Sequence, residues 1–217
     1  MGKTALLAGA TGLVGGYVLE QLLDDSFFDK VIVISRRPLT AKHPKLEVIL
    51  SEADALDQHA DKIKADIVFC CLGTTIKKAG SQEAFKAIDY FYPLHLAVTA
   101  QKNGAQKYLL ISALGANKHS AIFYNRVKGE TEEAIAALHY PAFHILQPSL
   151  IMGERQEKRF GEQIAQKFSP VFNALMLGPL TKYKSIDAQQ IAKAMLHYAK
   201  SDAKGTIRHE NDELLKV

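Results

Sequence analysis

A tyrosine and a lysine stand four residues apart in the stretch YNRVK, as Tyr124 and Lys128. On a helix this spacing places the phenol and the ammonium on one face, where the cation stabilises tyrosinate and so lets the phenol give and take a proton. Ser112 lies upstream at the end of an apolar run and can donate a hydrogen bond to an oxygen that gains negative charge. The same spacing also arises by chance on amphipathic helices. Taken together, the three residues predict a proton-transfer site.

A glycine-rich turn lies near the start of the chain, in TALLAGATGLVGG. Gly9, Gly12 and Gly15 follow an apolar run and precede an amphipathic stretch. At such a strand-to-helix turn, free backbone N–H groups and the positive end of the helix can hold a pyrophosphate that comes close because side chains are missing. A tight connection that only needs a positive φ is the alternative interpretation. The place of the turn in a first βαβ unit predicts dinucleotide binding.

Two adjacent arginines, Arg36 and Arg37, follow the second apolar run in VIVISRRP. An NAD site carries an acidic residue at this point for the ribose hydroxyls, whereas guanidinium groups bind a 2′-phosphate through paired hydrogen bonds. A pair of solvated surface arginines is the alternative. Asp54, after the third run, can accept a hydrogen bond from an adenine amino group or can be a solvated loop residue. The arginines favour NADP(H) as the cofactor.

The elements that must position these residues follow from the hydrophobic pattern. Short apolar runs predict strands at 5–8, 31–35, 47–50, 67–72, 108–111 and 143–146, and amphipathic stretches predict helices at 13–24, 81–103, 121–139 and 187–200. Pro93 should kink or restart the longest helix. Continuous apolar strands joined by helices predict an α/β fold of the Rossmann type, a doubly wound parallel sheet with helices on both faces.

Length and composition limit the function classes. The 217 residues, 47% of them hydrophobic, are expected to form a single domain over 1–217. A net charge of +4 with scattered lysines suits an anionic small molecule better than nucleic acid. Two adjacent cysteines, no leader and no apolar run of membrane-spanning length predict a cytoplasmic protein that does not enter a membrane. The oligomeric state is left open.

Long, ordered motifs carry a family resemblance. With GATGLVG, CCLGTT, KAGSQEAFKAIDYFY, LLISALGANKHSAIFYNRVKGETE and QPSLIMGERQEKRFGE, the chain resembles the atypical, extended-like branch of the short-chain dehydrogenase/reductase superfamily along nearly its whole length. Within that branch it is most similar to the Tat-interacting-protein-like oxidoreductases. The resemblance implies hydride transfer with NADP(H) to or from a small carbonyl or alcohol substrate.

The resemblance also implies roles for individual residues. Tyr124 would be the proton donor or acceptor, Lys128 its pKa partner and ribose anchor, and Ser112 the hydrogen-bond donor to the carbonyl. The residues expected to hold the cofactor fall into four groups. These are Gly9, Thr11, Gly12, Leu13, Val14 and Gly15 for the pyrophosphate; Arg36 and Arg37 for the 2′-phosphate; Leu72, Gly73 and Thr74, with Asp54, for the adenine or ribose side; and Ile151 and Arg159 for the nicotinamide end and a phosphate.

Two departures from the family pattern limit what can be carried over. The asparagine that many relatives place in the fourth helix corresponds to Asp89, which puts a proton relay through that position in doubt. Only 66 residues follow Ile151, so the segment of about 151–217 is predicted to form a small substrate-side lobe, and its size argues against a bulky sugar-nucleotide substrate.

Other functions and sites remain as alternatives. The resemblance makes an NADPH-binding regulator or scaffold with protein partners the second hypothesis, and a structural protein with a vestigial fold the third. Cys70 and Cys71 are expected to pack at a strand end, with redox sensing as the alternative. The eight histidines show no metal-ligand spacing, so no metal site is expected.

Overall fold

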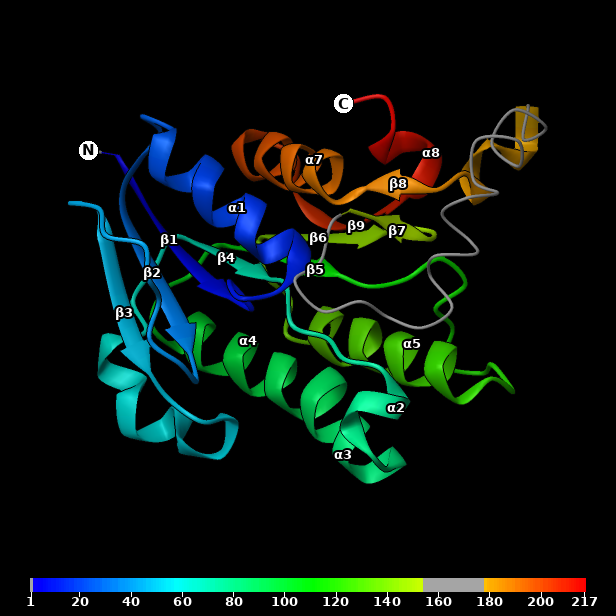
Figure 1. The fold of residues 1–217 in the computed structure, drawn as a ribbon, viewed down its shortest axis with the longest axis horizontal. Helices are drawn as coiled ribbons and strands as arrows, with labels where there is room; N and C mark the ends of the chain where they lie inside the picture. Colours follow the sequence, from blue (N-terminus) through cyan, green and yellow to red (C-terminus); the bar gives the residue numbers. More distant parts are fainter. Residues whose placement is uncertain (1, 154–177) are drawn as a thin grey trace.

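Seven parallel strands form one sheet at the centre of the molecule, in the order β3-β2-β1-β4-β5-β6-β9 (Figure 1). The computed structural model describes residues 2–153 and 178–217. The strands are β1 (Lys3–Ala8), β2 (Phe28–Ser35), β3 (Leu46–Leu50), β4 (Ile67–Cys70), β5 (Lys107–Ile111), β6 (Ala142–Gln147) and β9 (Gly205–Glu210).

Helices cover both faces of this sheet, as Figure 1 shows. On one face lie α1 (Leu13–Asp24), α7 (Ala188–Lys200) and the short α8 (Asn211–Leu214). On the other lie η1 (Ala53–Lys62), α4 (Tyr92–Lys102) and α5 (Phe123–Ala136). No helix in the described ranges is both long and apolar enough to cross a membrane. The predicted doubly wound Rossmann-type fold is confirmed.

The two halves of the hydrophobic core explain why the central strands have unbroken apolar sequences. In β1, Ala5 and Leu7 belong to the cluster under α1 and α7, whereas Leu6 and Ala8 belong to the cluster on the opposite face. All four side chains are fully buried. Because helices cover both faces, successive residues of a central strand are apolar whichever way they point.

The strand β9 was not predicted. Its sequence, GTIRHE, is polar, and most of its side chains are exposed or half-buried because it forms the edge of the sheet beside β6. Together with α7 it belongs to the main layers. The remainder of the segment that was predicted as a substrate-side lobe is 151–187, of which the structure describes 151–153 and 178–187. Its described elements are β7 (Ile151–Met152), η3 (Gly178–Tyr183) and β8 (Ile186–Asp187), with β7 paired to β8.

The restart expected at Pro93 takes the form of a π-helical turn. After α2 (Ile76–Ala79), α3 (Gln82–Lys86) leads into the π turn η2 (Ala87–Phe91) and then α4, in whose first turn Pro93 lies. Proline has no N–H to donate, so the helical hydrogen-bond pattern must change close to it. The π turn also carries Asp89, which is buried.

Two histidines are buried between β6, β9 and the helices above them. The Nδ1 of His144 lies 3.0 Å from the Nε2 of His209, whose Nδ1 lies 3.1 Å from a carboxylate oxygen of Glu213. The Tyr198 ring stacks on His209 at 3.7 Å. Burial is the main cause that lowers the pKa of His144 to about 4, helped by His209 and Lys107. Burial also lowers the pKa of His209, although Glu213 opposes it.

This pair predicts a loss of stability in mild acid. Between pH 6.5 and about 4, His144 is protonated in the unfolded chain but stays neutral in the folded protein. The free energy of unfolding should therefore fall as the pH drops through this range. The slope is at most about 1.4 kcal/mol per pH unit for one histidine. Urea unfolding followed by circular dichroism at several pH values measures it.

A matched pair of variants isolates the cause. His144→Phe should flatten the slope in this range, whereas His119→Gln, at an exposed histidine, should keep it. Equal slopes in both variants would show that His144 is not responsible.

Candidate cofactor and proton-transfer site

The turns after β1, β2 and β4 meet at the carboxyl edge of the sheet. In the strand order, β1 lies between β2 and β4. The chain first adds β2 and β3 on one side of β1 and then adds β4, β5, β6 and β9 on the other side. A crevice forms at such a switch point, outside the carboxyl ends of the strands. The fold thus brings the predicted segments 9–15, 36–37 and 72–74 to one edge.

The glycines of the first turn are required by close backbone contacts. Gly9 has a φ of 90°, and a Cβ on it would lie 2.5 Å from the carbonyl oxygen of Cys71. A Cβ on Gly15 would lie 2.0 Å from the carbonyl oxygen of Gly9. Both distances are far below any real contact, so α1 can approach β1 and the β4 exit only with glycine at these positions.

The N-terminus of α1 has no side-chain cap among the described residues, although the Gly12 N–H donates to the Gly9 carbonyl oxygen. Gly12 occupies the cap position without a side-chain hydrogen bond, and the first turn contains no acidic residue. Thr11 and Gly12 are exposed, whereas Val14 and Gly15 are buried. The exposed N–H groups and the positive helix end fit a pyrophosphate.

The segment after β6 returns over this turn. A Cβ on Gly153 would lie 3.1 Å from the side chain of Leu13, and Ile151 packs against the core beneath α1. The structure therefore brings Ile151 and Leu13 to the same end of the site. Arg159, predicted to bind a phosphate, lies outside the described residues.

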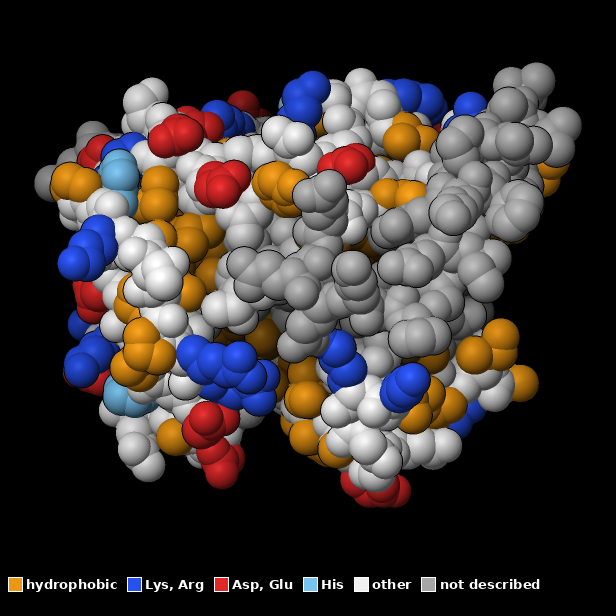
Figure 2. Space-filling model, in the orientation of Figure 1, with side chains coloured by type: hydrophobic (Ala, Val, Ile, Leu, Met, Phe, Trp, Pro, Cys, Tyr) orange, Lys and Arg blue, Asp and Glu red, His pale blue; other side chains and the backbone are white. Residues whose placement is uncertain are grey.

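Arg36 and Arg37 lie exposed where β2 ends. The Ser35 hydroxyl donates to the Arg37 carbonyl oxygen at 2.7 Å and accepts from the Arg37 N–H at 3.2 Å, which fixes the turn. Within residues 2–153 and 178–217 neither guanidinium pairs with a carboxylate. Figure 2 shows Lys and Arg side chains gathered near the end of β2, beside a hollow in the surface.

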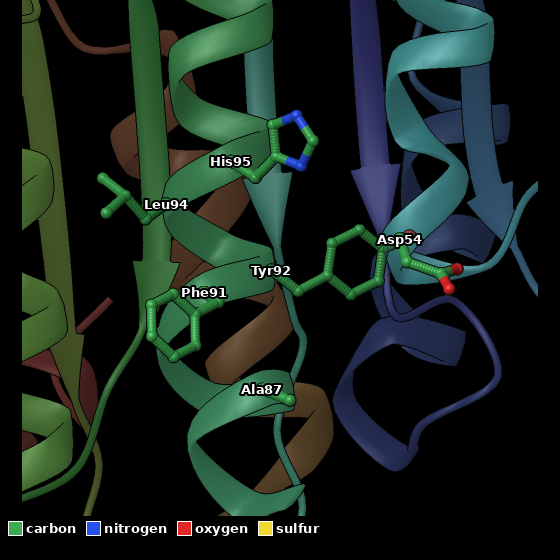
Figure 3. A pocket seen from close by; sticks show the side chains of 6 residues that line it. All are labelled: Asp54, Ala87, Phe91, Tyr92, Leu94 and His95. Atoms are coloured by element: carbon green, nitrogen blue, oxygen red, sulfur yellow. The ribbon is translucent and has the colours of Figure 1, made fainter. Parts of the chain in front are cut away.

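Asp54 lines a largely apolar pocket of about 440 Å³ between η1 and the η2–α4 helix. Figure 3 shows the Tyr92 ring directed toward Asp54 across the pocket, with the side chains of Ala87, Phe91, Leu94 and His95 along the helix. Burial is the main cause that raises the pKa of Tyr92 to about 12, so its phenol stays neutral. A flat aromatic group suits such a wall.

Tyr124 and Lys128 lie one turn apart on α5, at the edge of the same region. The Tyr124 ring packs against Phe85 at 5.7 Å between ring centres. The Lys128 ammonium is buried and lies 2.8 Å from a carboxylate oxygen of Asp89. Burial, the largest influence, acts to lower the pKa of Lys128, but Asp89 and Tyr124 outweigh it and the pKa is raised. Lys128 therefore stays charged beside the phenol.

Ser112 is engaged by a partner that was not predicted. Its hydroxyl donates to Glu132 at 2.5 Å, and Gln147 donates to the same oxygen at 2.8 Å. The other oxygen of Glu132 accepts from Arg208 at 3.1 Å. Since a serine has one O–H donor, the proton of Ser112 points to Glu132 in this structure.

A sequence signal for Glu132 does exist. The buried positions of α5 include Val127, Lys128, Thr131, Glu132 and Ile135, a stripe at helical spacing that contains three polar side chains. Polar residues in an inward stripe need partners, because burial without one is costly. The partners of Glu132 come from the end of β5, from β6 and from β9, which local spacing does not reveal.

The two cysteines form no disulfide, and Cys70 is buried at the end of β4. Burial raises the pKa of both thiols, which keeps them protonated and unreactive. In the part of the chain that the structure describes, no three potential metal ligands lie together.

Comparison with known proteins identifies the family. Residues 9–151 match the model of a family described as NAD(P)H-binding. The chain belongs to this NAD(P)H-binding family. The match begins at Gly9 and ends at Ile151, so it spans the glycine turn, the arginines and the Tyr124–Lys128 pair.

Full-length relatives confirm the predicted branch of the short-chain dehydrogenase/reductase superfamily. Protein HTATIP2 of Rattus norvegicus is 33% identical over 220 residues, covering 99% of this chain and 89% of its own. Protein FMP52, mitochondrial, of Lodderomyces elongisporus is 33% identical over 228 residues, covering 100% and 94%. The corresponding Aspergillus niger protein is 35% identical over 205 residues, covering 91% and 86%.

Solved structures agree on the fold. MoeE5 in complex with UDP-glucuronic acid and NAD has a TM-score of 0.74 at 15% identity, covering 94% of this chain and 75% of its own. UDP-N-acetylglucosamine 4-epimerase from Methanobrevibacter ruminantium has a TM-score of 0.72 at 20% identity, covering 96% and 76%. At these identities the likeness shows the Rossmann-type fold alone.

The relatives correct one expectation. Several of them are named as mitochondrial proteins, which contradicts the prediction of a cytoplasmic protein. That prediction rested largely on unpaired cysteines. Cysteine usage separates oxidising from reducing compartments and does not tell one reducing compartment from another.

Neighbouring glycines of α1 give a direct test of the turn. Gly15→Ala should destabilise the fold by about 2 kcal/mol or more, because its Cβ meets backbone. Gly16→Ala, whose Cβ would have its nearest neighbour at 3.8 Å, should stabilise it by about 0.5–1 kcal/mol through helix propensity. Urea midpoints and NADPH affinity, from calorimetry, measure both effects.

Only Gly15→Ala should also lose NADPH binding, since it displaces the helix end that faces the crevice. Equal behaviour of the two variants would mean that the contact between Gly15 and Gly9 does not shape the site.

Proposed function

We propose that the chain is an NADP(H)-dependent oxidoreductase that transfers hydride between the nicotinamide and a small carbonyl or alcohol substrate. Tyr124 is the acid and base, Lys128 keeps a positive charge beside it, and residues 9–15, 36–37, 54, 72–74 and 151 hold the cofactor. The observation that carries the proposal is the buried, charged Lys128 one helical turn from Tyr124, at the sheet edge that also holds the glycine turn.

The residues present fit such a cofactor. A pyrophosphate suits the uncapped, exposed N-terminus of α1, and a 2′-phosphate suits two exposed guanidinium groups without carboxylate partners among the described residues. The pocket beside Asp54 offers an apolar wall for the adenine end. When bound, the cofactor supplies or accepts the hydride.

The protein's own part in the reaction is the proton. In the reducing direction the Tyr124 phenol donates its proton to the substrate oxygen as negative charge grows there, and the charged Lys128 stabilises the tyrosinate that remains. In the oxidising direction the same pair removes the proton. Ser112 has a smaller part, because its hydroxyl proton is already directed to Glu132.

A second function has support from the same geometry. The Lys128 ammonium is paired with Asp89, and the Ser112 hydroxyl with Glu132. Two of the three predicted catalytic groups thus have protein partners of their own. A protein that binds NADPH and passes its occupancy to a protein partner, with little turnover, would also use this arrangement.

The arginines predict the choice of cofactor. NADPH should bind at least tenfold more tightly than NADH, a difference of about 1.4 kcal/mol. Arg36→Asp should abolish the preference, because it repels the 2′-phosphate. Isothermal titration calorimetry with both cofactors measures this, and the chain's lack of tryptophan also leaves NADPH fluorescence free of overlap.

Lys30→Ala provides the control. Lys30 lies in β2, is exposed and pairs with Glu47, and it stands far along the strand from its carboxyl end. Its removal should change neither affinity. Equal binding of NADPH and NADH by the wild type would show that Arg36 and Arg37 are only surface charges.

Removal of the Tyr124 hydroxyl should affect turnover and cofactor binding differently. Tyr124→Phe should keep the NADPH affinity within a few-fold yet reduce the turnover number by roughly 100-fold or more, the usual scale for loss of a positioned acid. A panel of aldehydes, ketones and quinones, followed by nicotinamide absorbance, supplies the substrate.

Tyr140→Phe is the matched control, because that phenol donates to the Ala97 carbonyl within the core. It should cost stability and leave turnover nearly unchanged. Tight NADPH binding with no turnover across the panel would favour the regulatory function over the enzyme. Normal turnover of Tyr124→Phe would overturn the assignment of the acid.

A further inference from the structure

Asp89 connects three parts of the candidate site. One of its carboxylate oxygens lies 2.8 Å from the Lys128 ammonium. The other accepts a hydrogen bond of 2.8 Å from the backbone N–H of Thr74. Its own carbonyl oxygen accepts from the hydroxyl of Thr131 at 2.8 Å. The π turn is therefore joined both to the loop after β4 and to α5.

The contact between Asp89 and Lys128 is buried, but it lies close to the crevice beneath Gly73. The Asp89 side chain is fully buried and that of Lys128 is 7% exposed. Gly73 is exposed, and a Cβ on it would lie 3.4 Å from Asp89 Oδ1 and 3.6 Å from Lys128 Nζ. Because Gly73 has no side chain, the ion pair lies directly under the loop that was predicted to hold the cofactor.

The donors and acceptors leave room for a further ligand. An ammonium carries three N–H donors, and the contact of Lys128 with Asp89 Oδ1 is an ion pair without hydrogen-bond geometry, so N–H groups remain for Tyr124 and for a hydroxyl that enters beside Gly73. Of the two carboxylate oxygens of Asp89, one accepts from the Thr74 N–H, whereas Oδ1 contacts Lys128 as an ion pair and accepts no hydrogen bond among the described residues. Asp89 therefore holds its two partners at a fixed separation.

We propose that Asp89 is a positioning residue whose carboxylate clamps the Lys128 ammonium to the Thr74 N–H, so that the cofactor loop 72–74 and the helix that carries Tyr124 move as one unit. The proposal rests on the proposed cofactor site. Asp89 takes no proton from the substrate in this scheme. It acts through Lys128 and Thr74.

Charge gives the clamp a second effect. The groups that face Lys128 are Asp89 from η2, Tyr124 from α5 and Cys70 from β4. Burial alone would lower the pKa of Lys128, and Asp89 is the strongest of the groups that raise it. Loss of the carboxylate should let the buried ammonium release its proton in a range where the wild type does not.

Amide hydrogen exchange tests the clamp without cofactor or substrate. In Lys128→Met, the buried Asp89 carboxylate loses the cation that holds it in place, which weakens the bond from Thr74. Exchange at the Thr74 amide should become at least tenfold faster. The Ala84 amide, which donates to the Ser81 hydroxyl in α3, is the control and should change less than twofold. Unchanged exchange at Thr74 would overturn the proposal.

NADPH affinity between pH 7 and 9 tests the link to the cofactor, in a range where the 2′-phosphate is already at least about nine-tenths dianionic because its second pKa lies near 6. Wild-type affinity should vary less than twofold across it, whereas Asp89→Asn should weaken at least fivefold toward pH 9. In a Lys128→Met background the added Asp89→Asn should change affinity less than twofold. An equal loss in both backgrounds would show that Asp89 does not act through Lys128.

The two measurements also separate this proposal from the proposed function. Absence of NADPH binding by the wild type would refute the function, and exchange at Thr74 would still decide whether the clamp exists. The exchange measurement needs no change at Asp89, so it stands even if Asp89→Asn does not fold.

Discussion

The site depends on one steric constraint, the close approach of backbone to backbone at Gly9 and Gly15. Gly15 lets α1 start against the Gly9 carbonyl, and Gly9 in turn lies against the exit of β4 at Cys71. That close approach directs the N-terminus of α1 toward the crevice. It also fixes the position of the loop 72–74 relative to the glycine turn. Gly73 in this loop then lies over the Asp89–Lys128 ion pair. A single methyl group at the first contact would therefore disturb positions as far away as α5.

Most of the fold could be predicted because burial on both faces leaves a strong signal. Each central strand is apolar at successive positions, and α1 begins and ends at the predicted residues. β9 gave no such signal, since an edge strand with the sequence GTIRHE keeps polar side chains in water. Pro93 was correctly linked to a change in the helix. The form of that change is a π turn that places Asp89 inside the protein, and it depends on contacts with the loop after β4 and with α5 that local sequence does not encode.

The candidate site was predictable where motif spacing and strand ends coincide, as at the glycine turn, the arginines and Tyr124 with Lys128. What the sequence could not supply are the partners of these residues. Glu132 meets Ser112 only because α5 packs against β5 and β6, and Arg208 reaches Glu132 from a strand that was not predicted. Asp89 was noticed as a departure from the family pattern, yet its ion pair with Lys128 follows from tertiary structure. Sequence motifs thus predict which side chains can react. Tertiary packing determines which of their hydrogen-bond donors already have a partner within the protein.

The position of β9 in the chain bears on the order of folding. Its pairing with β6 brings residues 205–210 to residues 142–147, so the new strand contacts must offset the entropy of closing a long loop. β1 and β2 close a much shorter loop. Because β9 carries Arg208, a chain folded only as far as β6 would hold the Glu132 carboxylate without its cation. The most C-terminal strand of the sheet thus completes the electrostatic surroundings of Ser112, and any folding intermediate that lacks the β6–β9 pairing also lacks this ion pair.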